Sequence, residues 1–161
     1  MIGHLSHLNY KIHSIKGRYL PLTDLKPITD NWDSFVVKDL NGASVNGTPI
    51  PVYRFGSGNK KILMWSQMHG NESTTTKGLM DFLNFLNTSS EASSQILQQC
   101  TLIVIPILNP DGAFTYTRFN KNQVDLNRDF QDFSQPESAF LKTVFDYISP
   151  DFCFNLHDQR T

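Results

Sequence analysis

The sequence predicts an α/β domain in which helices cover the faces of a β-sheet. Three apolar runs, residues 61–67, 101–108 and 151–156, have the length and composition of buried strands. Two stretches with the apolar spacing of amphipathic helices, at about 73–86 and 134–149, lie between these runs. Alternation of strands and helices along a chain is typical of a sheet with helices packed against it.

The N-terminal segment, residues 1–44, has the weakest pattern. A short helix is expected within 23–32, and short strands are expected at 35–37 and 50–55, separated by the turn-rich sequence NGASVNG. A chain of 161 residues is long enough for one domain with its own core. We therefore expect residues 1–161 to form a single domain that includes this segment.

The first predicted helix, residues 73–86, has apolar side chains at positions i, i+3, i+4 and i+7: Leu79, Phe82, Leu83 and Leu86. The serine-rich residues 88–94 are expected to form a loop, and a short helix is expected at 95–99. The strand at 101–108 follows, rich in Ile and Val.

The second predicted helix follows a long polar stretch, residues 109–133, which is expected to be a loop. A structureless loop of that length in a compact domain is usually functional. Ser134 and Glu137 have the spacing of a capping box, with Pro136 in the first helical turn. Pro150 ends the helix before the last strand.

Composition excludes several classes of function. The 14 basic and 15 acidic residues nearly cancel, so there is no electrostatic argument for binding nucleic acid or an anionic membrane.

The N-terminus has no signal-peptide pattern, and a cytoplasmic location is expected. Cys100 and Cys153 lie in apolar runs, where free cysteines usually behave as small buried hydrophobic residues. The oligomeric state is not determined by the sequence.

The first chemical motif is the H-x-x-E sequence that starts at His69 and ends at Glu72. Imidazole nitrogen and carboxylate oxygen are both zinc ligands, and Gly70 gives the backbone freedom to turn between them. His157, at the end of the last predicted strand, offers a third ligand. In isolation the motif more often means a partly exposed histidine and a glutamate in a first helical turn. A lone strand-end histidine is likewise weak evidence.

The second motif lies in the 109–133 stretch. It contains Asn-Pro-Asp-Gly at 109–112, then Arg118, then Val-Asp-Leu-Asn-Arg at 124–128. Arginine binds carboxylates through two parallel hydrogen bonds and stabilises developing oxyanions. The alternative is a solvated loop whose arginines pair with Asp125 and Asp129.

These motifs follow three predicted strands. His69, Asn109 and His157 each come directly after one, and ligands of open α/β sheets bind beyond the carboxyl ends of the strands. Convergence at one sheet edge is therefore expected.

Taken together, these motifs resemble the zinc carboxypeptidases of the carboxypeptidase A type, over roughly residues 45–161. HGNE resembles the first ligand pair of that family, NPDG and VDLNRDF resemble its substrate loop, and the histidine of FNLHDQ resembles its third ligand. The resemblance implies a mixed, mostly parallel sheet with flanking helices, of which this chain would form part.

The resemblance also implies the chemistry. One zinc ion would be held by His69, Glu72 and His157, and Arg118 would polarise the scissile carbonyl. Asn127 and Arg128 would hold the free C-terminal carboxylate of a peptide substrate. The implied function is that of a zinc-dependent metallocarboxypeptidase. Hydrolysis of N-acyl amino acids or murein peptides by a related amidohydrolase is an alternative.

The family pattern is incomplete in this sequence. The general-base glutamate and a tyrosine of the family lie well downstream of the third ligand, and only four residues follow His157. Neither Glu137 nor Asp158 matches the motif of the missing base. We therefore expect the N-terminal, zinc-binding portion of a longer enzyme, with apolar surface exposed along its last strand. A zinc-binding fragment without turnover is the remaining alternative.

Overall fold

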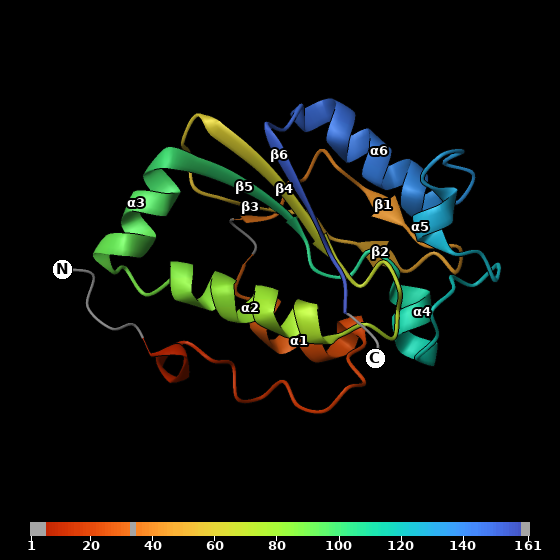
Figure 1. The fold of residues 1–161 in the computed structure, drawn as a ribbon, viewed down its shortest axis with the longest axis horizontal. Coiled ribbons are helices and arrows are strands. Elements are labelled where there is room, and N and C mark those ends of the chain that lie inside the picture. The colour runs from red at the N-terminus through yellow and green to blue at the C-terminus, as the bar shows by residue number, and fades with distance from the viewer. Residues whose placement is uncertain (1–5, 33–34, 159–161) are drawn as a thin grey trace.

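A four-stranded sheet with the strand order β3-β5-β4-β6 forms the centre of the computed structural model (Figure 1). The structure describes residues 6–32 and 35–158. The strands of this sheet are β3 (Tyr53–Phe55), β4 (Lys60–Ser66), β5 (Cys100–Ile105) and β6 (Phe152–Leu156). β4 is parallel to β5 and to β6, whereas β3 is antiparallel to β5. The predicted mixed, mostly parallel sheet is confirmed.

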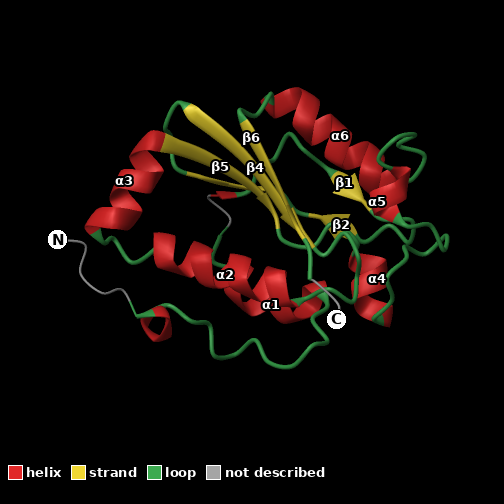
Figure 2. Cartoon of the chain, viewed as in Figure 1, coloured by secondary structure: helices red, strands yellow, loops and turns green. Residues whose placement is uncertain are grey.

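Helices cover both faces of this sheet (Figures 1 and 2). One face carries α1 (Leu22–Thr29), α2 (Thr74–Leu86) and α3 (Glu91–Gln99). The other carries α6 (Pro136–Ile148) and a two-stranded antiparallel sheet of β1 (Gly42–Ala43) and β2 (Pro49–Ile50). The remaining helices are short: η1 (His7–Asn9), α4 (Pro110–Thr115) and α5 (Leu126–Asp129). No helix in the described ranges is long and apolar enough to cross a membrane.

The two hydrophobic cores follow from the alternation of side chains along the strands. On the α2 side, the sheet contributes four buried residues: Tyr53, Phe55, Leu102 and Val104. On the α6 side it contributes four others: Leu63, Trp65, Ile103 and Ile105. β5 therefore buries side chains on both faces, as its nearly continuous apolar sequence predicts, whereas β4 buries side chains on the α6 side and has Ile62 and Met64 partly buried on the α2 side.

The site is positioned by the parallel strands. Because β4, β5 and β6 run in the same direction, their carboxyl ends meet at one edge. Backbone hydrogen bonds continue the β4–β5 pairing past the strand ends, from Leu108 N to Ser66 O at 3.0 Å and from Asn109 N to Gln67 O at 3.1 Å. The segments that carry His69, Asn109 and His157 leave from this edge, as expected.

The prediction of a structureless loop over 109–133 is wrong, because α4 and α5 lie within it. Each begins at a side-chain cap. The carboxamide of Asn109 accepts a hydrogen bond from Gly112 N at 2.8 Å, and the carboxylate of Asp125 accepts one from Asn127 N at 3.0 Å. Helices of four and six residues are too short to show apolar periodicity in a sequence.

Two helix starts also differ from the prediction. α3 begins at Glu91 rather than 95, because Ser90 caps it by accepting a hydrogen bond from Ser93 N. The capping box at Ser134 is wrong, because Gln135 is the N-cap residue of α6 and has no side-chain cap. The Ser134 hydroxyl donates to Asp129 instead.

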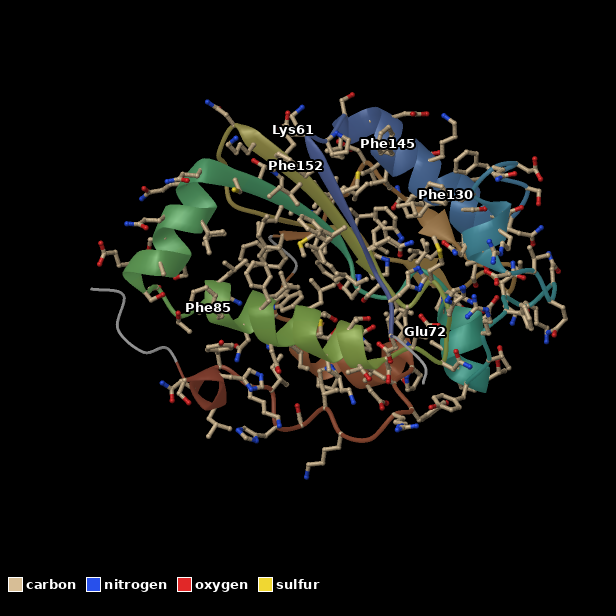
Figure 3. All side chains as sticks on the ribbon, viewed as in Figure 1. Lys61, Glu72, Phe85, Phe130, Phe145 and Phe152 are labelled. Carbon is tan, nitrogen blue, oxygen red and sulfur yellow. The ribbon has the colours of Figure 1, made fainter. Side chains whose placement is uncertain are left out.

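β6 was expected to be buried, and that expectation is wrong. Among the described strands it is an edge strand paired only with β4. Its aromatic side chain Phe152, labelled in Figure 3, is 54% exposed, and Phe154 is 48% exposed. Cys153 is exposed rather than a buried hydrophobic residue. The apolar surface expected along this last strand is present.

Candidate metal centre

The three predicted ligands converge at the carboxyl end of the sheet. Nδ1 of His69 lies 3.0 Å from Oε1 of Glu72, and Nδ1 of His157 lies 2.9 Å from Oε2. One ligand atom from each of the three residues lies within 4.8 Å of the others. His69 and Glu72 are buried, with exposed fractions of 2% and 4%, and His157 is partly exposed. Both imidazoles therefore present the same nitrogen to one carboxylate.

A tight backbone turn after β4 brings His69 and Glu72 together. Glu72 N donates to His69 O at 3.0 Å. Between them, Gly70 packs against the backbone of α4: a Cβ atom at this position would lie 1.9 Å from the carbonyl carbon of Gly112. Only glycine permits this approach without a backbone shift. The NPDG segment thus packs directly against the H-x-x-E turn.

The second nitrogen of His69 is also held. Its Nε2 lies 2.9 Å from Oδ1 of Asp125, the residue that caps α5. A carboxylate on the far nitrogen of a metal-binding histidine fixes its tautomer and orientation. From the sequence, Asp125 was expected only to pair with a loop arginine, so its contact with His69 was not predicted. The position of Asp125 in the VDLNR run, next to the expected substrate-binding residues, is the sequence signal that could have pointed to this contact.

Arg118 lies at the rim of the cluster. Its Nε donates to Oδ2 of Asp125 at 3.0 Å, and Nη1 donates to Oε1 of Glu72 at 3.4 Å. The side chain is 40% exposed. A guanidinium has five N–H donors, so several of them remain available to a bound molecule. The structure brings Arg118 to the predicted ligands.

Asn127 and Arg128 lie on α5, immediately after Asp125, and both are exposed. In the described part of the chain, neither side chain has a hydrogen-bond partner. The alternative interpretation of the sequence was that the loop arginines pair with Asp125 and Asp129. This pairing is present for Arg118 with Asp125. It does not hold for Asp129, whose carboxylate accepts hydrogen bonds from the 134–138 segment.

The carboxylates of the cluster are held in their charged form. Burial raises the pKa of Glu72, but its hydrogen bond to His157 and the contacts with His69 outweigh burial, so the pKa lies below the ordinary value. Burial likewise raises the pKa of Asp125, and the bonds from His69 and Arg118 lower it further than burial raises it. Two negative charges therefore face the imidazoles and Arg118.

These residues fit a metal ion. Two imidazole nitrogens and one carboxylate form the ligand set of catalytic zinc sites that keep an open position. Among residues 6–32 and 35–158, no other group of three His, Cys, Asp or Glu side chains comes together in this way. Glu137 and Asp158 do not direct their carboxylates at the cluster: Glu137 binds Val45 N and Asn120, and Asp158 binds Thr74 N and Thr75 N.

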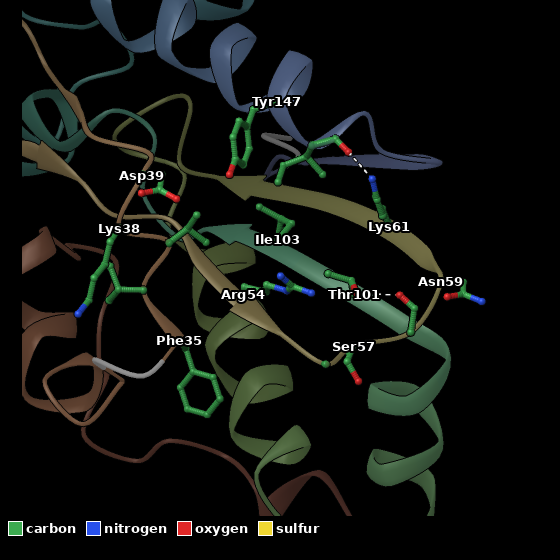
Figure 4. A pocket seen from close by; sticks show the side chains of 15 residues that line it. Phe35, Lys38, Asp39, Arg54, Ser57, Asn59, Lys61, Thr101, Ile103 and Tyr147 are labelled. Carbon is green, nitrogen blue, oxygen red and sulfur yellow. Dashed lines mark hydrogen bonds between the residues drawn. The ribbon is translucent and has the colours of Figure 1, made fainter.

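The opposite end of the sheet has an open pocket of about 890 Å³ (Figure 4). Its charged lining residues are Lys38, Asp39, Arg54 and Lys61. Lys61 Nζ donates to the carbonyl of Ile148 at 3.0 Å at the end of α6. The lining contains neither histidine nor cysteine, and Asp39 is its one carboxylate. This pocket is therefore not a candidate for the metal chemistry.

A sequence profile of the zinc carboxypeptidase family matches residues 25–145. The chain belongs to the zinc carboxypeptidase family. A probable carboxypeptidase 2 of Trichophyton verrucosum is 27% identical over 101 residues, which are 62% of this chain and 20% of the fungal protein. A gamma-D-glutamyl-L-diamino acid endopeptidase 1 of Lysinibacillus sphaericus is 35% identical over 80 residues, which are 45% of this chain and 20% of that protein.

Solved structures agree on the fold. A metallo-carboxypeptidase from Pseudomonas aeruginosa, in complex with (2-guanidinoethylmercapto)succinic acid, matches 86% of this chain and 40% of its own chain with a TM-score of 0.74 at 23% identity. The chain spans about a fifth of the length of the curated relatives it matches. The mixed sheet with flanking helices is thus the fold of a metallo-carboxypeptidase, represented in part.

Proposed function

We propose that this chain forms the zinc-binding part of a metallocarboxypeptidase, which hydrolyses the C-terminal peptide bond of peptides. The observation that supports this most directly is that Nδ1 of His69 and Nδ1 of His157 both contact the carboxylate of Glu72. Membership of the zinc carboxypeptidase family supports the same proposal.

His69, Glu72 and His157 are the proposed ligands of one zinc ion. Zinc, when bound, supplies a Lewis acid and lowers the pKa of a bound water. The chain prepares its own part of this site, because Asp125 orients the imidazole of His69 through Nε2, with Nδ1 facing Glu72.

Arg118 is the proposed electrophile for the scissile carbonyl. Its guanidinium already points toward the cluster, held by Asp125, and it is partly exposed to an incoming substrate. A fixed cation stabilises the negative charge that develops on the carbonyl oxygen in the transition state. Asn127 and Arg128 are the proposed binding residues for the terminal carboxylate, because both are exposed on α5 beside Asp125.

A pair of substrates tests this proposal. The protein that contains this chain is incubated with a blocked dipeptide that has a free C-terminal carboxylate, and with the same dipeptide as a C-terminal amide. Cleavage of the first and not the second is expected. The Arg128→Ala variant is expected to raise KM for the free acid, while Lys38→Ala, at the other end of the sheet, leaves it unchanged. A zinc-loaded enzyme that cleaves no C-terminal residue would refute the proposal.

Murein peptides are a second candidate substrate class for the same site. The observation that favours them is the 35% identity to the gamma-D-glutamyl-L-diamino acid endopeptidase 1 of Lysinibacillus sphaericus over 80 residues. Assays on cell-wall peptides and on ordinary C-terminal dipeptides, with the same enzyme preparation, separate the two. A higher kcat/KM on the cell-wall peptides would replace the first candidate with the second.

A further inference from the structure

The carboxylate of Asp158 caps a helix to which it does not belong. Its Oδ2 accepts a hydrogen bond from Thr74 N and its Oδ1 accepts one from Thr75 N, each at 2.9 Å. The N-cap residue of α2, Ser73, makes no side-chain cap and donates its hydroxyl to the carbonyl of Arg18. Asp158 therefore satisfies backbone N–H groups that would otherwise lack an acceptor.

Two further hydrogen bonds join the same segments. The hydroxyl of Thr75 donates to the carbonyl of Leu156 at 3.2 Å, and Asp158 N donates to Oε2 of Glu72 at 3.3 Å. Apart from the contact between His157 and Glu72 themselves, four hydrogen bonds thus join residues 156–158 to residues 72–75. We refer to this set of bonds as the strand–helix clasp.

The clasp holds the two ligands that come from distant parts of the sequence. Glu72 lies just before α2, and His157 lies between the two β6-end residues that bind α2. Within residues 6–32 and 35–158, β6 pairs with β4 and with no other strand, and His157 lies beyond its last paired residue. The strand–helix clasp therefore restrains the distance between His157 and Glu72 from both sides of His157.

We propose that Asp158 is a positioning residue of the metal centre, acting through His157 and Glu72. Its two oxygens fix the end of β6 against α2, so that Nδ1 of His157 meets the Glu72 carboxylate before a metal ion binds. This inference rests on the proposed zinc site. An ordinary helix cap would stabilise α2 without changing how the ligands hold a metal.

Zinc affinity of the full chain, measured by competition with a chromophoric chelator, tests the proposal. Asp158→Ala is expected to weaken zinc binding about 10- to 100-fold, the range found when groups that orient metal ligands are removed. Asp158→Asn keeps an acceptor oxygen and is expected to recover part of the affinity. If Asp158→Ala does not fold, the zinc affinity of Asp158→Asn is compared with that of the parent chain instead, and a weaker affinity is expected.

Asp151 provides a matched control at the other end of the same strand. Its Oδ2 accepts a hydrogen bond from Lys61 N at 2.8 Å, so Asp151→Ala removes a similar contact far from the ligands. This variant is expected to bind zinc as the parent chain does. A second readout is the visible absorption spectrum of the Co²⁺-loaded chain at saturating cobalt. Its band positions are expected to shift in Asp158→Ala and to stay unchanged in Asp151→Ala.

The outcomes separate this inference from the proposed function. If the parent chain binds no zinc, the proposed zinc site fails, and the inference fails with it. If the parent chain binds zinc and Asp158→Ala binds it equally well with an unchanged cobalt spectrum, only the inference fails. The inference also fails if Asp151→Ala weakens binding as much as Asp158→Ala does, because β6 would then act as a whole.

Discussion

The two ends of the central sheet differ in how far their charged side chains are buried. At the carboxyl end, His69 and Glu72 are buried, the side chain of Asp125 is 16% exposed, and His69 contacts both carboxylates. At the amino end, the cationic side chains of Lys38 and Arg54 are exposed and line an open pocket (Figure 4). Both ends are polar, but only one collects its charges into a buried cluster.

This difference supports the proposal that the carboxyl end of the sheet is the functional end. Burying ionised groups costs several kcal/mol unless they are paired or bind a metal. A cluster of two carboxylates with two imidazoles is therefore unexpected in a purely structural role, whereas exposed lysines and arginines need no explanation.

Loss of a ligand at the carboxyl end is expected to have the largest effect. His157→Ala removes one of three proposed zinc ligands, so zinc content after gel filtration is expected to fall from about one ion per chain to none. Arg54→Ala, at the amino end, is the control and is expected to retain the ion. Metal analysis of the eluted protein measures both. Equal zinc content in the two variants would contradict the claim that the zinc site lies at the carboxyl end and not at the amino end of the sheet.

Removal of the carboxylate behind His69 is expected to have the next largest effect. Asp125→Ala frees the Nε2 side of the imidazole, and zinc affinity is expected to drop about 10- to 100-fold. The exposed Asp132, seven residues later, is the matched control. An affinity within twofold of the parent value in Asp125→Ala would mean that this contact does not orient the ligand.

Asp129 is expected to stabilise the fold near the carboxyl end of the sheet without taking part in metal binding. Its buried carboxylate accepts hydrogen bonds from the backbone and hydroxyl of Ser134, from Gln135 N and from the hydroxyl of Ser138. Asp129→Ala is expected to lower the free energy of unfolding by about 2–3 kcal/mol, because these donors lose their acceptor. Urea denaturation measures the change. A loss no larger than that of Asp132→Ala would contradict this account.

The same residue predicts a pH dependence. Burial raises the pKa of Asp129, but the hydrogen bonds from Ser134, Ser138 and Gln135 outweigh burial and hold the pKa below its ordinary value of 3.8. Its stabilising contribution is therefore fully present above pH 3.8 and is lost as the pH falls through the depressed folded-state pKa. The stability difference between the parent chain and Asp129→Ala is expected to shrink over that acidic range. A difference that grows on acidification would show the sign to be wrong.

Substitutions at the amino end are expected to have the smallest effects. Arg54 is exposed and has no partner in the described part of the chain, so Arg54→Ala is expected to change the free energy of unfolding by less than about 0.5 kcal/mol. Thermal unfolding measures the change. A loss above about 1 kcal/mol would reveal an unrecognised role for this pocket.

Much of the fold could be predicted because strong patterns determine it. β4 and β5 have nearly continuous apolar sequences, and α2 has apolar side chains at helical spacing. The short helices α4 and α5 were missed because local side-chain caps, at Asn109 and Asp125, determine them rather than periodicity. The apolar sequence of β6 predicted a buried strand, because an apolar sequence does not say whether another element covers it; its exposure was expected only from the incomplete family pattern.

The candidate site divides in the same way. His69, Glu72 and His157 could be predicted from motifs at strand ends, and the structure brings them together. Asp125 and Asp158 could not be assigned, because their contacts join segments that are distant in the sequence. A motif identifies the residues that carry chemistry, but the groups that orient them depend on tertiary packing.

The most direct test of the central claim is anomalous diffraction at the zinc edge from crystals of this chain grown with zinc. One peak is expected, at about 2.0–2.2 Å from Nδ1 of His69, from Nδ1 of His157 and from a carboxylate oxygen of Glu72. A chain that shows no peak at these residues, or whose zinc lies at the N-terminal histidines His7 and His13, would contradict it.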